Sequence, residues 1–229
     1  MPEIKTKRTK IELIIFDVNQ TMFSLNELQK RFKKFGLKKY LVDSWFLSVL
    51  KEGFSNSLCQ QFVNFKTIGK NELIKVFLQN NIFYNDKIIN YILNGFANLK
   101  VHNDIKISLK VFKTNKLKVV TLTNGSVSNT KLLLKKNKIN KFIDKCFSIN
   151  SFRKWKPARE VYLKTCEKMK IKPKRALMIA AHGWDINGAK LAGLQTAYIT
   201  RYEKKLSNFY SKPDFIGIDL EEIIKKLKF

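Results

Sequence analysis

The sequence is poor in acidic residues and in arginine, and both shortages bear on the class of protein. It holds 18 Asp and Glu against 45 Lys and Arg, a formal charge of +27, and six of the basic residues are Arg. Specific reading of DNA bases relies on the planar, bidentate Arg side chain, so the composition argues against a nucleic-acid partner of that kind. The excess of Lys is compatible with a solvated surface, with loose phosphate attraction or with a field that gathers small anions.

Cysteines and long apolar runs are also scarce. Cys59, Cys146 and Cys166 are an odd number without CxxC spacing, which argues against a disulfide framework and a zinc site. We therefore expect buried free thiols in a reducing cytoplasm. No apolar run reaches about 18 residues, and residues 1–10 are polar, so we expect no membrane-spanning helix, no secretory signal and no membrane partner.

Hydrophobic residues nevertheless make up 45% of the 229 residues, enough for a sizeable core. An apolar run at 11–16 predicts a buried strand of a parallel sheet. From about residue 25 to 99 helical patterns dominate. The helices are expected at 26–35, 39–51, 71–79 and 86–97, separated by turns near Gly36, Gly53, Gly69 and Asn80–Asn81.

Beyond residue 101, strand and helix patterns alternate, which favours a parallel sheet with helices on both faces. The strands are expected at 117–122, 145–149, 176–181, 196–200 and 214–218, and the helices at 126–136, 160–169, 185–192 and 220–227. The predicted fold class is α/β, a Rossmann-like parallel sheet core with an inserted helical cap domain. Residues 1–23 and 101–229 would form the core domain, and residues 24–100 the cap.

Polar residues follow several predicted strands at the point where each strand ends. Asp17 follows the first strand, Thr123-Asn124 the second and Asp185 the strand at 176–181, whereas Lys156 comes a short loop after the strand at 145–149. Sites in open parallel sheets lie beyond the carboxyl ends of the strands. Each residue taken alone is explained more simply as a helix cap, a turn former or, for Lys156, one of 39 lysines. The ordered set of four predicts that two carboxylates, a hydroxyl and an ammonium converge on one crevice.

Four segments of the sequence resemble the motifs of the haloacid dehalogenase superfamily, and most closely those of its type II (L-2-)haloacid dehalogenase branch. They are FDVNQTMF at 16–23, LTNGS at 122–126, KPxxxVY at 156–162 and AAHGWDINGA at 180–189. The stretch around Trp45 and Phe46 is more loosely similar to caps of this branch. The resemblance covers nearly the full chain.

The resemblance implies a hydrolase of 2-haloalkanoic acids, similar to (S)-2-haloacid dehalogenases. Asp17 would displace halide from the α-carbon with inversion, and water would then attack the carboxyl carbon of the resulting ester to release a 2-hydroxy acid. Lys156 would hold Asp17 ionised, and Asp185, with Lys156, would activate the water. Thr123 would hydrogen-bond the substrate carboxylate or the nucleophile, and Asn124 would donate to the leaving halide.

The substrate and halide pocket implied by the resemblance contains Asn19, Phe46, Thr123, Asn124, His182 and Trp184. His182 stands where relatives commonly have Asn, and it would act either as a polar pocket wall or as a proton acceptor. Tyr162 would either hydrogen-bond within the site or pack in its helix, and Trp155 would pack beside Lys156.

Two departures separate the sequence from the phosphatases of the same superfamily. Asn19 stands in place of their second Asp, and Ala180 and Ala181 stand in place of an acidic Mg²⁺ ligand. The resemblance therefore implies metal-independent chemistry without a cofactor, on a small anionic 2-haloacid. The alternatives are a phosphatase or other small-acid hydrolase of this superfamily, and a catalytically weak basic binding protein. A homodimer is left open because relatives are often dimers.

A third departure concerns the cap. Well-studied relatives carry a cap Arg that faces the halide and carboxylate, but no Arg occurs between Arg31 and Arg153. Its place would fall at Phe46 or near Leu37 to Lys39, and neither an apolar nor a Lys side chain supplies the planar fork. Asn124, backbone amides and Trp184 would then remain to receive the halide, which leaves activity on ordinary chloro-acids open.

Overall fold

A computed structural model describes residues 9–228, so residues 1–8 of the predicted core domain and residue 229 lie outside the described residues. Its main sheet has six strands in the order β5-β4-β1-β6-β7-β8, and every neighbouring pair is parallel. The strands are β1 (Leu13–Phe16), β4 (Lys118–Thr123), β5 (Lys145–Ser148), β6 (Ala176–Ala180), β7 (Gln195–Ile199) and β8 (Phe215–Gly217). Strands β1 and β6 are buried along their full length, which explains their uninterrupted apolar sequences.

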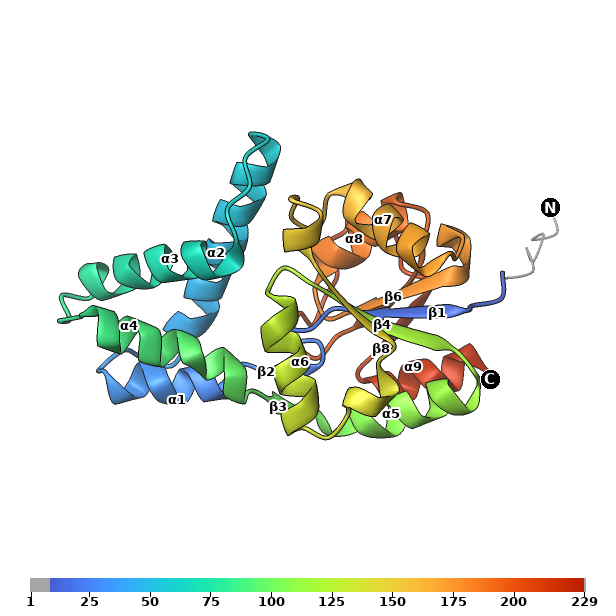
Figure 1. Cartoon of the computed structure of the whole chain (residues 1–229), viewed down its shortest axis with the longest axis horizontal. Coiled ribbons are helices and arrows are strands. Elements are labelled where there is room, and N and C mark those ends of the chain that lie inside the picture. Colours follow the sequence, from blue (N-terminus) through green and yellow to red (C-terminus); the bar gives the residue numbers. More distant parts are fainter. Residues whose placement is uncertain (1–8, 229) are drawn as a thin grey trace.

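Helices cover both faces of this sheet, with α7 and α8 on one side and α5 and α9 on the other (Figure 1). Their bounds are α5 (Asn103–Thr114), α6 (Val127–Lys136), α7 (Arg159–Met169), α8 (Gly183–Leu191) and α9 (Leu220–Leu227), with short 3₁₀ turns at Asn140–Phe142, Ile149–Ser151 and Pro173–Arg175. Ser126 and Asp219 cap α6 and α9 by accepting a backbone N–H three residues on. The predicted fold class, a Rossmann-like α/β core with inserted helices, is confirmed.

The inserted helices form a second group beside the sheet (Figure 1). They are α1 (Asn26–Lys34), α2 (Leu41–Leu58), α3 (Phe65–Gln79), α4 (Asp86–Leu93) and a 3₁₀ turn at Asn94–Asn98. The chain leaves for this group through β2 (Phe23–Ser24) and returns through β3 (Lys100–Val101), and these two strands pair antiparallel. The division into a core at 1–23 and 101–229 and a cap at 24–100 stays a prediction.

Two glycines expected in turns lie inside helices, so that prediction was wrong. Helix α2 continues through Gly53, and α3 begins at Phe65 and continues through Gly69. The reason at Gly53 is close packing, because a Cβ there would lie 2.4 Å from the ring of Trp155. The Gly69 carbonyl accepts a hydrogen bond from Trp45 Nε1 at 3.0 Å, which joins α2 to α3. The packing therefore requires a glycine at Gly53, and neither glycine ends its helix.

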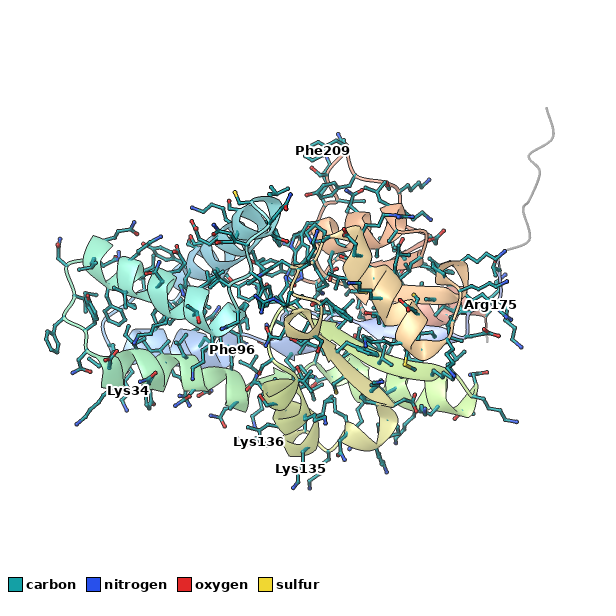
Figure 2. All side chains as sticks on the ribbon, turned by 45° about the horizontal axis from the view of Figure 1, so that its top comes forward. Lys34, Phe96, Lys135, Lys136, Arg175 and Phe209 are labelled. Carbon is teal, nitrogen blue, oxygen red and sulfur yellow. The ribbon has the colours of Figure 1, made fainter. Side chains whose placement is uncertain are left out.

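The three thiols differ in exposure, and the basic side chains are spread over the surface. Cys166 is buried and Cys146 half-buried, but Cys59 is exposed just past the end of α2, so the expectation that all three are buried was wrong. Lys34, the neighbouring pair Lys135 and Lys136, and Arg175 lie on three separate parts of the molecule (Figure 2), which fits a dispersed charge better than one binding patch. Across residues 9–228, no helix has the length and apolar composition required to cross a bilayer.

Candidate active site

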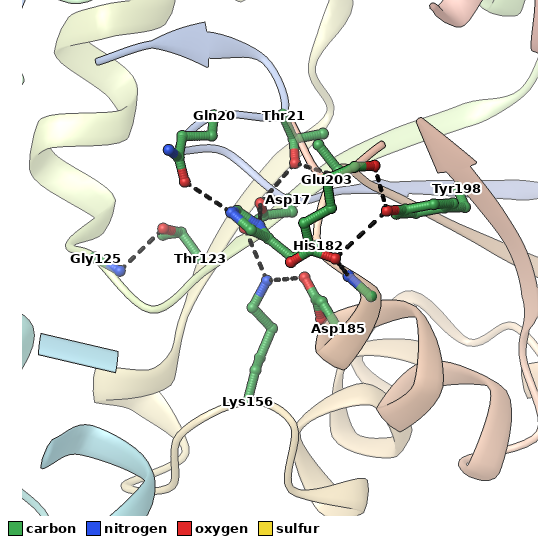
Figure 3. A network of polar contacts seen from close by, with 12 residues as sticks. Asp17, Gln20, Thr21, Thr123, Gly125, Lys156, His182, Asp185, Tyr198 and Glu203 are labelled. Carbon is green, nitrogen blue, oxygen red and sulfur yellow. Dashed lines mark hydrogen bonds and ion pairs between the residues drawn. The ribbon is translucent and has the colours of Figure 1, made fainter. Parts of the chain in front are cut away.

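Three of the predicted residues meet at the carboxyl end of the sheet. Asp17 follows β1, Lys156 lies in the loop before α7, and Asp185 lies in the first turn of α8. Lys156 Nζ lies 2.9 Å from Asp17 Oδ1 and 2.6 Å from Asp185 Oδ2 (Figure 3). Lys156 and Asp185 are fully buried and Asp17 nearly so. One ammonium therefore bridges two carboxylates out of contact with solvent.

Burial disfavours the charged form of all three groups, but their hydrogen-bond and charge partners shift the three pKa values in different directions. For Asp17, Lys156 and then His182 and Thr21 outweigh burial and hold the pKa of the carboxyl well below its usual range. For Lys156, burial lowers the pKa but the two carboxylates raise it further, so the ammonium stays charged. For Asp185, burial prevails over Lys156 and Tyr162 and raises the pKa. The first carboxylate is thus poised as an anion and the second as the better proton acceptor.

Two hydroxyl groups, absent from the predicted catalytic set, complete the hydrogen bonds of the carboxylates. Thr21 donates to Asp17 Oδ2 at 2.7 Å and accepts from the Ala181 N–H at 2.9 Å. Tyr162 donates to Asp185 Oδ1 at 2.6 Å, so the hydrogen-bonding interpretation of Tyr162 is the one confirmed. Thr21 carried a sequence signal as well, since it lies four residues after Asp17 in the first motif.

His182 contacts the Asp17 oxygen that Lys156 does not contact. Its Nδ1 is 3.2 Å from Asp17 Oδ2 and its Nε2 is 2.9 Å from Gln20 Oε1. The ring stacks between Phe46 of α2 and Trp184 of α8, at centroid distances of 6.3 and 5.3 Å. Gln20 adopts φ of 60°, a left-handed conformation that costs roughly 1–2 kcal/mol in a residue with a Cβ. The fold imposes this conformation, and the Gln20 side chain is buried against His182.

Thr123 and Asn124 lie at the end of β4, next to this network. Thr123 Oγ1 accepts from the Gly125 N–H at 2.9 Å, and Figure 3 places this contact apart from Asp17. Asn124 Oδ1 accepts from the Lys156 backbone N–H at 3.1 Å, which positions the lysine loop. Asn124 Nδ2 and Trp184 Nε1 are buried and have no hydrogen-bond partner among the described residues. Two buried N–H donors of the predicted site are therefore left without an acceptor within the described residues.

A cavity of about 270 Å³ lies beside the carboxylates, between the inserted helices and β4. Neither Asp17 nor Lys156 lines it, but Val18, Asn19 and Thr123 do. The other lining residues are Asn64, Phe65, Lys66, Leu93, Asn94, Phe96, Ala97, Gly125, Ser126, Ser128, Asn129, Thr130 and Asn150. Within the described chain, Lys66 is the one charged side chain of this lining. Asn19, one of the residues implied for the substrate pocket, therefore lies in the wall of this cavity.

No arginine lines this cavity within residues 9–228. Arg31 pairs with Glu27 at 3.0 Å, Arg201 with Asp104, and the Arg153 guanidinium lies 5.3 Å from the Phe62 ring centre. Lys66 is thus the cation that the inserted helices contribute to the cavity wall. Sequence reasoning missed it because one Lys on a Lys-rich helix carries no distinguishing signal.

The site does not suit a divalent cation of the kind that phosphatase relatives bind. The two carboxylates are already bridged by an ammonium, and the neighbouring Ala180 and Ala181 supply no oxygen from their side chains. Across residues 9–228, no three His, Cys, Asp or Glu side chains are grouped so as to hold a metal ion.

The fold and the site together define a class: a parallel α/β core with an ionised, buried aspartate after its first strand and a Lys–Asp pair facing it. The family model described as haloacid dehalogenase-like hydrolase matches residues 14–199. The chain belongs to this family.

Individual relatives are distant in sequence but similar over nearly the full length. The chain is 20% identical to (S)-2-haloacid dehalogenase 2 of Pseudomonas sp. (strain CBS-3), covering 96% of this chain and 97% of the relative. It is 24% identical to pyrophosphatase PpaX of Bacillus cereus (strain Q1), covering 94% and 95%. The solved L-2-haloacid dehalogenase of Xanthobacter autotrophicus superposes with a TM-score of 0.88 at 17% identity, covering 95% of this chain and 98% of that one.

Proposed function

We propose that the protein is a metal-independent hydrolase that releases halide from 2-haloalkanoic acids through an ester on Asp17. The observation that carries the proposal is the pairing of Asp17 with Lys156 and His182 at 2.9 and 3.2 Å, within a buried site. This environment keeps the carboxylate ionised and desolvated, which a nucleophile at carbon requires.

In the first step, an oxygen of Asp17 attacks the α-carbon of the substrate and the carbon–halogen electron pair leaves with the halide. Asn124 Nδ2 and Trp184 Nε1, both buried and unpartnered within residues 9–228, are the donors that we assign to the halide. Phe46 forms part of the apolar wall, through its contact with His182. These donors take the part that the missing cap arginine has in relatives.

In the second step, water attacks the carboxyl carbon of the ester. Asp185, whose pKa is raised by burial, accepts the proton of that water, and Lys156 at 2.6 Å fixes the orientation of Asp185. Tyr162 holds the other oxygen of Asp185. The products are a 2-hydroxy acid and the restored carboxylate of Asp17.

The cavity limits the size of the substrate. A volume of about 270 Å³ suits a short-chain acid. We assign the substrate carboxylate to the end of the cavity formed by Lys66, Thr123 and the α6 N-terminus after Ser126. In this assignment Thr123 and Asn19 contact the substrate and do not contact the nucleophile.

The decisive experiment measures halide and hydroxy-acid release from chloro-, bromo- and fluoro-substituted 2-haloacids, with a phosphatase panel in the presence and absence of Mg²⁺. We expect halide release without added metal, and its loss in Asp17→Asn. The matched control is Asp86→Asn, at an exposed aspartate of α4 that pairs with Lys70. Phosphate release that needs Mg²⁺, without halide release, would replace this proposal with the phosphatase alternative. Salt-sensitive nucleic-acid binding that survives Asp17→Asn would instead favour a basic binding protein.

Three further parts of the proposal concern the whole chain. We propose the division into core (1–23 and 101–229) and cap (24–100), which limited proteolysis at residues 23–25 and 99–102 would test. We also propose a reducing, cytoplasmic location, with which three free cysteines, one of them the exposed Cys59, are consistent. Light scattering on the purified protein decides between a monomer and a homodimer.

A further inference from the structure

We propose that His182 is held as an imidazolium by Gln20 and that, with Thr21, it supplies the two donors on Asp17 Oδ2 that stabilise the oxyanion of ester hydrolysis. This inference rests on the proposed function and assigns one residue a role within it. It starts from a geometric fact: both ring nitrogens of His182 face oxygen atoms, Asp17 Oδ2 at 3.2 Å and Gln20 Oε1 at 2.9 Å.

A neutral histidine carries one ring proton and so donates through one nitrogen. With the proton on Nε2, the Nδ1 lone pair would point at the ionised Asp17 oxygen. With the proton on Nδ1, the Nε2 lone pair would point at the Gln20 carbonyl oxygen. In either neutral form, two acceptor atoms therefore face each other without a proton between them. In a buried site this costs free energy.

Rotating the Gln20 amide does not remove the conflict. Gln20 Nε2 faces Asp43 Oδ1 of α2 at 3.4 Å, and Gln20 also hydrogen-bonds Tyr202. Exchanging the amide oxygen and nitrogen would place the Gln20 oxygen against the Asp43 carboxylate. Asp43 thus fixes the orientation of the Gln20 amide. The Gln20 oxygen in turn requires a proton on His182 Nε2.

Several titratable groups lie around His182. Asp17 and Tyr202 contact the ring itself, and Asp43 of α2 reaches it through Gln20. Lys156, Asp185 and Glu203 lie further away, against Asp17, Lys156 and the Gly183 N–H, respectively. Four of these groups are carboxyls and one is an ammonium. Figure 3 shows His182 in the middle of this network, with Gln20 on one side and Asp17 on the other.

The position of the two donors gives the imidazolium a role in the chemistry. His182 Nδ1 and Thr21 Oγ1 both point at Oδ2, whereas Lys156 holds Oδ1. If Oδ1 forms the ester bond, Oδ2 is the carbonyl oxygen of the ester. Water then adds to Cγ, the π-electron pair moves to Oδ2, and the two donors receive the developing charge.

The atoms and protons of this step balance. The attacking water gives one proton to Asp185 as its oxygen bonds to Cγ. When the oxyanion collapses, the Cγ–Oδ1 bond breaks, and Lys156 gives Oδ1 a proton to form the hydroxyl group of the product. Asp17 regains a carboxylate made of Oδ2 and the water oxygen, its remaining proton returns to Lys156, and Asp185 releases its proton to solvent. His182 keeps both ring protons throughout.

The protonation state is tested by ¹⁵N NMR of the imidazole rings in the substrate-free protein near neutral pH. The sequence contains two histidines, His102 and His182, so the spectrum of His102→Asn assigns both rings. We expect two nearly equal, proton-bearing nitrogen signals for His182. One unprotonated and one protonated nitrogen signal for His182 would overturn the proposal. This NMR measurement requires no substrate.

The catalytic role is tested with His182→Leu, which keeps bulk but removes the donor, and His182→Asn, which restores a neutral donor near the Nδ1 position. We expect ester hydrolysis to slow by roughly 10²–10³-fold in the Leu variant and less in the Asn variant. The ester should then accumulate after one equivalent of halide, visible as a mass increase of the intact protein. Asp86→Asn, at an exposed aspartate of α4, serves as the control and should turn over like the wild type.

The outcomes separate the two proposals. A wild-type protein that releases no halide from any 2-haloacid overturns the proposed function, whatever the NMR result. A wild type that turns over while the Leu variant shows no burst and no ester overturns the role of His182. If the Leu variant does not fold, the Asn variant and the wild-type NMR spectrum decide.

Discussion

The two walls of the active-site crevice are built differently. On the sheet side, Asp17, Lys156 and Asp185 are buried and saturated with short hydrogen bonds. On the side of the inserted helices, aromatic rings such as Phe65 and Phe96 pack against one another, and the cavity lining is largely neutral apart from Lys66. Saturated charges cannot be altered singly without cost, whereas an apolar wall tolerates exchange. The difference indicates that the sheet side holds the chemistry and the helical side sets the choice of substrate.

The strongest challenge to this contrast is Lys156→Met. Removing the ammonium leaves Asp17 and Asp185 buried together without compensation, so we expect unfolding free energy to fall by about 3–5 kcal/mol and activity by roughly 10³-fold or more. Urea unfolding and halide release measure the two effects. Lys154→Met, at a half-exposed lysine 3.5 Å from Glu160, is the matched control and should change little. Retained activity in Lys156→Met would mean that the lysine is structural.

Gly53→Ala tests the seam between the two walls. The new methyl group would meet the buried Trp155 ring, next to Lys156, so we expect a loss of about 1–3 kcal/mol in stability together with reduced activity. Gly69→Ala in α3 is the control, since its methyl group would make ordinary contact at 3.5 Å and should stabilise the helix by about 0.5–1 kcal/mol. Equal thermal midpoints for the two variants would contradict the close contact.

Acid unfolding distinguishes the two carboxylates of the sheet side. The pKa of Asp17 is below its ordinary 3.8, so its stabilisation is present above that pH and is lost as the pH falls below 3.8. The pKa of Asp185 is raised, so ionising it weakens the fold as the pH rises above 3.8. We would measure urea midpoints from below pH 3.8 to neutral pH. In Asp17→Asn the midpoint should fall less than in the wild type as the pH drops below 3.8. In Asp185→Asn the midpoint should be higher than in the wild type toward neutral pH. Each slope is bounded at about 1.4 kcal/mol per pH unit, and parallel curves for the two variants would refute the contrast.

The smallest effect is expected on the helical side. Lys66→Gln removes the charged group of the cavity wall, and we expect KM to rise a few-fold, roughly 1 kcal/mol or less, with kcat unchanged. Lys70→Gln, one turn further along α3 and paired with Asp86, is the control. A fall in kcat with constant KM would mean that Lys66 takes part in catalysis. It would contradict the division into a catalytic sheet side and a substrate-selecting helical side.

The sheet side is also the part that the sequence predicts well. Asp17, Lys156 and Asp185 were expected together because strand-end positions follow from local apolar runs and from parallel topology. The helical side depends on how α2 and α3 meet the loop around Trp155, a contact between segments about 100 residues apart. The close approach at Gly53 and the cavity position of Lys66 arise only from that packing. Helix α5 likewise went unpredicted, although it covers one face of the sheet.

The central place of β1 sets the order in which the parts are completed during synthesis. This strand emerges first, yet its neighbours β4 and β6 begin at Lys118 and Ala176. Lys156 follows Asp17 by 139 residues. At about 5–20 residues per second, the aspartate waits on the order of ten seconds for its partner, while the intervening helices find local contacts at once. The residue proposed to begin each turnover is therefore among the first to be made and among the last to be put in place.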